Sequence, residues 1–160
     1  MKTNLNDVLH RVFCEVAERM AFLFCESPEA DASCEPPPEI IGAFMTFAGP
    51  LRGELRIATV PEVCREVASN VLGVEPDDEA AERASADALK ELLNVTCGRI
   101  LTELAGEKPV FDLSVPEVSE MSEDEWTRLG ESASTILLMV DEYPIRLTLS
   151  VDEMEGAQRD

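Results

Sequence analysis

Residues 87–104, DALKELLNVTCGRILTEL, lie in the longest predicted helix of the chain and decide its fold class. At about 100 degrees per residue, the apolar positions of this stretch fall within roughly a third of the helix circumference, which predicts one buried side. The residues of that side are Leu89, Leu92, Leu93, Thr96, Ile100 and Leu104. A helix of this kind has to pack on another layer, and the strand-like segments around it predict that the layer is a sheet.

The opposite side of the same helix carries Asp87, Glu91, Asn94 and Gly98, in a stripe about 60 degrees wide. Glycine inside an exposed helix costs about 1 kcal/mol relative to alanine, and asparagine about half of that. A glycine also removes the side chain that would hold another protein away, so the stripe has the features of a docking face. The alternative is an ordinary solvated face, since Glu-x-x-Asn spacing is common by chance.

The first half of the chain contains four predicted elements. Apolar residues at three-and-four spacing predict a helix over residues 5–25, and prolines predict a mobile loop over residues 26–38. Two strand-like runs joined near Gly49 and Pro50 predict a hairpin. Residues 60–74 predict a short helix with a proline in its first turn and Gly73 at its end.

The second half predicts the long helix over residues 75–106 and then a strand over 108–116. Residues 117–132 read as a loop with at most one helical turn around Trp126. A strand pair over 134–151 should turn near Asp141 and Glu142, with Pro144 favouring an edge strand, and residues 152–160 should fray. The order predicts an α+β fold in which two long helices pack on an antiparallel sheet, with a weak internal duplication.

Composition limits the classes of function. A chain of 160 residues predicts a single domain over residues 1–160, and its net charge of −20 makes nucleic acid and anionic membrane surfaces poor partners. No signal peptide or membrane-spanning run is evident, which favours a cytoplasmic protein. The five scattered cysteines and the single His10 form no metal-ligand spacing, so no metal site is expected.

The segment DALKELLN, residues 87–94, resembles the Asp/Ser-x3-Glu-x2-Asn signature of the CheC/CheX/FliY phosphatases of bacterial chemotaxis. Pro116 stands where that signature ends, although Asn94 and Pro116 enclose one residue fewer than is usual in the family. If Glu15 is aligned with Glu91, Phe22 falls opposite Gly98, and no asparagine matches Asn94. The chain is therefore similar to the CheX type, which has a single signature on its later helix. Phe22 is interpreted as a residue that packs at the edge of the core, with a dimer contact as the alternative.

The resemblance implies a phosphatase that acts on the phosphoaspartate of a CheY-like receiver domain. It makes Glu91 and Asn94 the catalytic pair and Asp87 and Gly98 contact positions, with Lys90 and Arg99 adding local charge. It also implies that the receiver supplies Mg²⁺, so that this chain needs no cofactor of its own, and that the chain forms a homodimer through sheet edges at 135–141 or 145–151. A non-catalytic receiver-binding adaptor of the same fold is the main alternative, and a flagellar switch component is a weaker one.

Overall fold

The sheet consists of two antiparallel hairpins that meet at their inner strands, as seen in the computed structural model, which describes residues 4–28 and 35–153. Its strand order is β3-β1-β2-β6-β5, and β4 also pairs with β1. The elements in chain order are α1 (Leu5–Ala21), β1 (Ile41–Ala48), β2 (Leu51–Thr59), α2 (Pro61–Leu72), α3 (Glu79–Ala105), β3 (Asp112–Leu113), β4 (Glu117–Glu120), α4 (Glu123–Glu131), β5 (Thr135–Val140) and β6 (Tyr143–Glu153).

The central pairing joins β2 to β6, from Leu51 opposite Glu153 to Ala58 opposite Arg146. The β1–β2 hairpin flanks it on one side and the β5–β6 hairpin on the other. This is the arrangement that two copies of a helix-plus-hairpin unit produce when they join edge to edge. The predicted α+β class and internal duplication are therefore confirmed.

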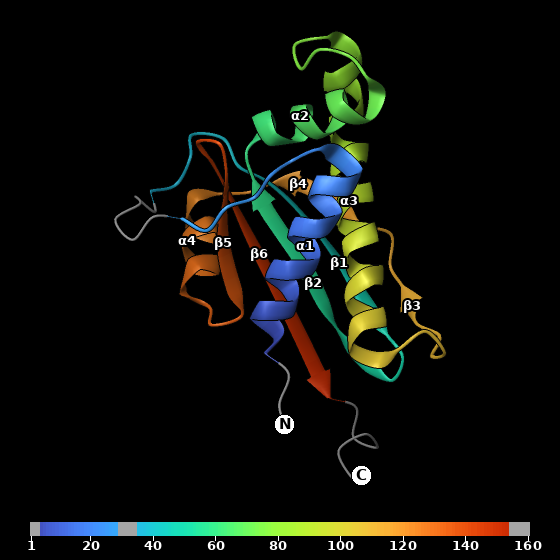
Figure 1. Cartoon of the computed structure of the whole chain (residues 1–160). Coiled ribbons are helices and arrows are strands. Elements are labelled where there is room, and N and C mark those ends of the chain that lie inside the picture. The colour runs from blue at the N-terminus through green and yellow to red at the C-terminus, as the bar shows by residue number, and fades with distance from the viewer. Residues whose placement is uncertain (1–3, 29–34, 154–160) are drawn as a thin grey trace.

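Helices α1 and α3 lie side by side against one face of the sheet, with α2 across their upper ends (Figure 1). Alternate residues of the inner strands, including Leu55, Ile57 and Leu147, point into this layer and are fully buried. Two ion pairs cross between the helices, Arg11 to Glu103 at 2.6 Å and Arg99 to Glu15 at 3.0 Å. Both pairs are about half exposed to solvent, so apolar burial supplies most of the stabilisation of this layer.

Helix α4 covers the opposite face of the sheet, where Trp126 packs with Ile40 and Ala58. The guanidinium of Arg146 stacks on the Trp126 ring at 4.5 Å and donates to the Trp126 carbonyl. The expected loop over residues 117–132 is wrong, because this segment contains both β4 and α4. Its helix has a capping box at Ser122 and Glu125, but Trp126 is its only buried residue, so the apolar pattern is short.

Other expectations about the first helix and the terminal strands also need correction. The first helix ends at Ala21, because Phe22 is left-handed with φ of 56°, and the Phe22 side chain is exposed instead of packed at the core edge. Strand β6, residues 143–153, lies between β2 and β5, and it is paired with β5 over residues 143–148 and with β2 over residues 146–153. Pro144 is tolerated on this inner strand because it precedes the first pair with β2 and faces only β5.

Parts of the expected loop over 26–38 and tail over 152–160 lie outside the described residues, namely 29–34 and 154–160. At the described start of the loop, the backbone of Glu26 forms two hydrogen bonds of 2.8 Å with Met139 on the outer edge of β5. Within residues 4–28 and 35–153, no helix is long and apolar enough to cross a bilayer.

Gly53 is required by the close approach of β2 and β6, because a Cβ there would stand 2.0 Å from the Ser150 carbonyl oxygen. We expect Gly53→Ala to lower the free energy of unfolding by at least about 2 kcal/mol, since backbone atoms of the central pair have to separate. Gly42→Ala on β1 is the matched control, because its Cβ would meet mainly the flexible end of Met121 at 2.8 Å. Urea unfolding of both variants measures the difference, and equal losses would contradict this explanation.

Candidate functional site

Helix α3 is capped at its start and ends at a glycine, and its buried side from Leu89 to Leu101 fixes the direction of the side chains around it. The Asp78 carboxylate accepts from the backbone N–H of Ala80 at 2.8 Å and caps the first turn, and Gly106 with φ of 83° ends the helix. All but one of the residues predicted to face the core are fully buried: Leu89, Leu92, Leu93, Thr96 and Ile100, while Leu104 is partly buried. The Thr96 hydroxyl donates to the Leu92 carbonyl at 2.7 Å, so even the polar member of this side is satisfied.

Burial of the leucine side turns Asp87, Glu91, Asn94 and Gly98, here called the α3 row, toward solvent. The first three are exposed and Gly98 is half-buried. A Cβ built on Gly98 would meet nothing within 4 Å, so the glycine leaves open space above the helix. The predicted exposure of this row is therefore confirmed, and none of its side chains is shielded by a loop of the described chain.

A pocket of about 370 Å³ lies between the α3 row and the chain segment 113–116. Its walls are Asp87, Lys90, Glu91 and Asn94 from α3 and Leu113, Ser114, Val115 and Pro116 from the connection between β3 and β4. The structure thus brings Pro116 against the helix that carries Asn94, although 21 residues separate them. Gly98 belongs to the same row but does not line this pocket.

The second wall is fixed by hydrogen bonds to β1. The Ser114 N–H donates to the Thr46 carbonyl at 2.9 Å, and the Thr46 N–H donates to the Ser114 hydroxyl at 2.8 Å. Strand β4 continues the pairing with β1 directly after Pro116. Sequence reasoning missed Leu113, Ser114 and Val115 as site residues, because only the pairing with β1 carries them next to α3.

Two of the equivalent positions on α1, Arg11 and Glu15, form ion pairs with residues of α3. Glu15 accepts from Arg99 at 3.0 Å, and Arg11 forms its ion pair with Glu103. The hydrogen bond from Arg11 lowers the pKa of Glu103 below its usual value. Glu15 therefore has a partner of its own, and Arg99 is held by Glu15, which corrects its expected role as a charge open to a docking protein.

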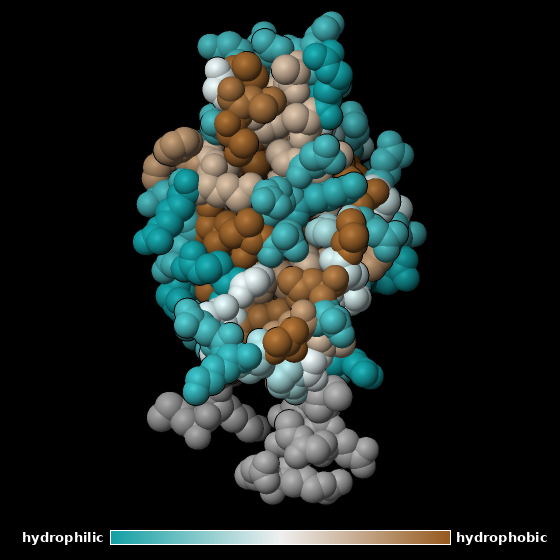
Figure 2. Space-filling model, turned by 90° about the vertical axis from the view of Figure 1, so that its right-hand side faces the viewer, coloured by the Kyte–Doolittle hydropathy of each residue, from teal (hydrophilic) through white to brown (hydrophobic). Residues whose placement is uncertain are grey.

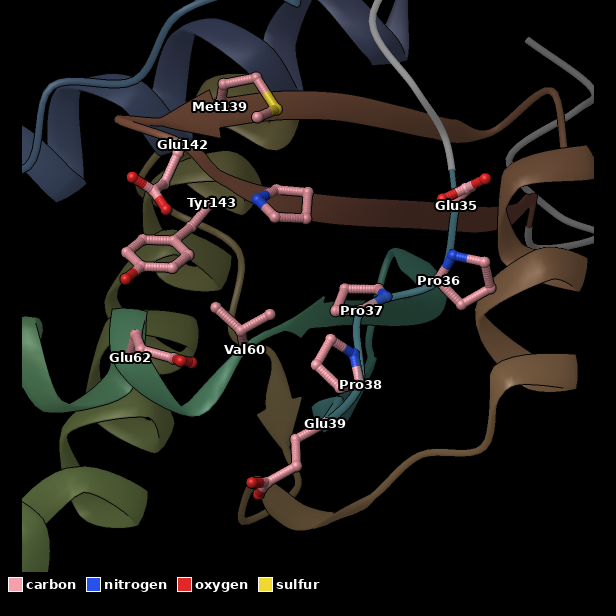
Figure 3. Close-up of a pocket in the computed structure, with 11 residues that line it drawn as sticks. Glu35, Pro36, Pro37, Pro38, Glu39, Val60, Glu62, Met139, Glu142 and Tyr143 are labelled. Carbon is pink, nitrogen blue, oxygen red and sulfur yellow. The ribbon is translucent and has the colours of Figure 1, made fainter.

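A different pocket, of about 400 Å³, lies away from the α3 row and shares no residue with it (Figure 3). Pro36, Pro37 and Pro38 form one part of it, while Glu62, Glu142 and Tyr143 come together at another. Partial desolvation and the carboxylates of Glu142 and Glu62 raise the pKa of Tyr143. Neither this pocket nor any other part of residues 4–28 and 35–153 groups three or more His, Cys, Asp or Glu side chains as metal ligands.

The buried cysteines are also poor candidates for chemistry. Burial raises the pKa of Cys64 to about 12 and that of Cys97 to about 11, so both remain thiols near neutral pH. Among the described residues, the α3 row is thus the arrangement best suited to act on another molecule. It presents a carboxamide and carboxylates on a helix beside an open pocket.

Comparison with known proteins gives a family and a fold. The family model described as chemotaxis phosphatase CheX matches residues 41–140. No curated protein matches the chain. Among solved structures, a chain of the CheX–CheY–BeF3–Mg²⁺ complex from Borrelia burgdorferi is 18% identical with a TM-score of 0.65, covering 95% of this chain and 100% of that one.

Two further structures have the same fold. The chemotaxis protein CheX from Vibrio vulnificus is 17% identical with a TM-score of 0.65, covering 94% of this chain and 97% of that one. A CheC-like superfamily protein from Shewanella sp. PV-4 is 16% identical with a TM-score of 0.62, covering 94% and 99%. Because the family model spans well over half of the sequence and includes α3, the chain belongs to the CheX family of chemotaxis phosphatases.

Proposed function

We propose that this chain is a phosphatase that removes the phosphoryl group from the phosphoaspartate of a CheY-like receiver domain. The observation that carries the proposal is the exposure of Asn94 beside an open pocket, with Glu91 one helical turn away on the same row. Family membership supports the reaction class, and the similar Borrelia burgdorferi structure is a complex of CheX with CheY.

Asn94 is proposed to orient the water that attacks phosphorus. An acyl phosphate is already reactive, so holding a water in line with the phosphorus is the main contribution that a partner protein can make. A carboxamide both donates and accepts hydrogen bonds and carries no charge that would repel the phosphoryl oxygens. Because α3 is fixed by its buried leucines, the backbone that carries Asn94 is in place before the receiver arrives, which lowers the ordering cost during the reaction.

Glu91 is proposed to pair with the active-site lysine of the receiver. Residues three apart on a helix have Cβ atoms about 5–6 Å apart, so this ion pair would set where Asn94 sits over the phosphorus. Asp87 and Gly98 are proposed as contact positions at either end of the row. The Mg²⁺ of the reaction is proposed to be held by the receiver, where it would neutralise charge on the phosphoryl group. The Borrelia burgdorferi complex of CheX with CheY also includes Mg²⁺, which supports this assignment.

The proposal places the chain in the cytoplasm, where receivers are phosphorylated. We also propose a homodimer that pairs through the outer edge of β5, since β5 is the last strand of the sheet order on that side and β6 lies between it and β2. Only part of the β5 edge is open for this pairing, because Glu26 already occupies the backbone groups of Met139.

Asn94→Ala tests the proposed role of the amide in orienting the water. We expect the rate of phosphate release from a phosphorylated receiver to fall by roughly 100-fold, because the group that orients the water is removed. The side chain is exposed and alanine is a better helix former, so the melting temperature should not fall. If wild type and variant give equal rates, both equal to that of the receiver alone, the chain is a receiver-binding adaptor at most.

Glu91→Gln separates the proposed role of Glu91 in binding from that of Asn94 in hydrolysis. We expect Glu91→Gln to raise KM for the phosphorylated receiver about tenfold, because it removes one charge of the proposed ion pair and keeps the side-chain shape. The defect should shrink as salt is raised from about 0.05 to 0.5 M, since salt already weakens the pair in the wild type. Stopped-flow phosphatase assays measure both, and unchanged KM at low salt would remove this role for Glu91.

Gly98→Ala should make the protein more stable and less active. We expect Gly98→Ala to raise the free energy of unfolding by about 0.5–1 kcal/mol, because a helical glycine is replaced and its Cβ meets nothing within 4 Å. The same change should lower kcat/KM for the receiver, since the added methyl holds the docking protein away. Ser85→Ala, on α3 but outside the row, is the control and should leave kcat/KM unchanged. A Gly98→Ala protein with full activity would remove Gly98 from the contact surface.

A further inference from the structure

A second hollow, of about 220 Å³, opens on the other flank of the α3 row, between α1, α2 and α3. Its floor is apolar: Met20 from α1, Ala68, Val71 and Leu72 from α2, and Ala84 and Ala88 from α3. We call it the three-helix pocket. Asp87 and Glu91 form its rim, and the same two residues line the pocket on the β3–β4 side. The row is therefore a polar ridge with a hollow along each flank.

The surface next to the three-helix pocket exposes large apolar side chains. Val71 is 53% exposed and Leu72 is 50% exposed. The Asn70 amide donates to the Ala21 carbonyl at 2.7 Å, which places Phe22, 66% exposed, beside this end of α2. Apolar patches interrupt the hydrophilic surface on the side of the molecule that carries α3 (Figure 2). Apolar groups gathered around a hollow next to a functional row are typical of a surface that another protein covers.

Phe22 adds an independent observation. It follows the last residue of α1 in the left-handed conformation, with φ of 56°, where glycine is the usual residue and a bulky side chain is strained. Its ring is mostly exposed and gains little from burial within this chain. A costly residue that contributes little to its own fold is explained if the ring contacts a partner.

A transient interface of ordinary size that is centred on Asn94 is wide enough to reach the three-helix pocket. A contact of about 600 Å² on each partner corresponds to a disc with a radius of about 14 Å. Measured along α3 from Asn94, Ala88 of the pocket lies six residues away, which is about 9 Å. A receiver that places its phosphoryl group at Asn94 and covers Glu91 therefore also covers the near part of this pocket.

The charge of the chain makes such an apolar contact necessary. The net charge is −20, and a receiver carries acidic residues around its phosphorylation site, so long-range attraction cannot draw the two proteins together. Burial of apolar surface does not depend on opposite charges and is little weakened by physiological salt. The three-helix pocket directly adjoins the α3 row, and apart from Asp87 and Glu91 its lining residues are all apolar.

We propose that the three-helix pocket receives an apolar side chain of the receiver domain and thereby selects which receivers this chain dephosphorylates. This inference rests on the proposed function and names how its substrate is recognised. Phe22 forms one side of the contact and the ends of Val71 and Leu72 form the other. The pocket provides affinity and selectivity, while Asn94 carries the hydrolysis step.

Leu72→Gln tests the pocket without disturbing the core, since Leu72 is half exposed. The probe is the receiver domain from the source organism that binds the wild-type chain most tightly when loaded with Mg²⁺ and beryllium fluoride. We expect its Kd, and the KM of its phosphorylated form, to rise about tenfold, with kcat within twofold of wild type. Val110→Gln is the matched control, because Val110 is 84% exposed and lines neither pocket of the row.

Phe22→Gly is a second variant of the same contact, chosen because it should not destabilise the fold. Glycine relieves the left-handed backbone, so the melting temperature should stay equal or rise while Kd and KM increase. Unchanged Kd and KM in both pocket variants would overturn the inference even if the phosphatase is active. A change in sedimentation with no change in receiver binding would also overturn it, by making a second copy of this chain the occupant.

Receiver binding and phosphate release are measured separately, so the pocket and the proposed phosphatase activity can fail independently. If no variant at Asn94 alters phosphate release but Leu72→Gln still weakens the complex with the beryllium fluoride form, the pocket is supported and the enzyme assignment fails. If no receiver from the source organism binds the wild-type chain, both proposals fail. If Asn94→Ala abolishes hydrolysis and the pocket variants bind like wild type, only the pocket fails.

Discussion

The burial of one side of α3 is the constraint on which the rest of this structure depends. Leu89, Leu92 and Leu93 are fully enclosed by α1, α2 and the sheet, so α3 cannot rotate without exposing them to water. Burying three leucines contributes on the order of 5–8 kcal/mol, far more than any contact made by the opposite side. That fixed rotation turns Glu91 and Asn94 outward, where both side chains are exposed to solvent.

The pocket on the β3–β4 side depends on a different kind of interaction. Segment 113–116 has little apolar burial of its own, and Val115 is mostly exposed. Its position comes from backbone pairing with β1 on both sides of Pro116 and from the reciprocal hydrogen bonds of Ser114 and Thr46. One wall of the candidate site is thus fixed by hydrophobic packing and the other by hydrogen bonds, and β1 links them.

The two long helices, both hairpins and the exposed face of α3 follow from local patterns, and the structure confirms them. Sequence-based expectations fail where the pattern is short or where distant contacts decide the outcome. Helix α4 buries one residue, Trp126, so its periodicity is too weak to separate it from a loop. Aromatic side chains usually pack inward, which favours the core edge for Phe22, yet the left-handed turn at this residue directs it to solvent.

By itself the sequence determined which side of α3 is buried, because helical spacing ties each residue to a direction once the apolar set is known. It thereby also determined that Asp87, Glu91, Asn94 and Gly98 share one outward row. Only the tertiary structure decided what stands beside that row. Segment 113–116 and the end of α2 reach α3 through strand pairing and helix packing between residues far apart in the chain, and no local pattern encodes such distances.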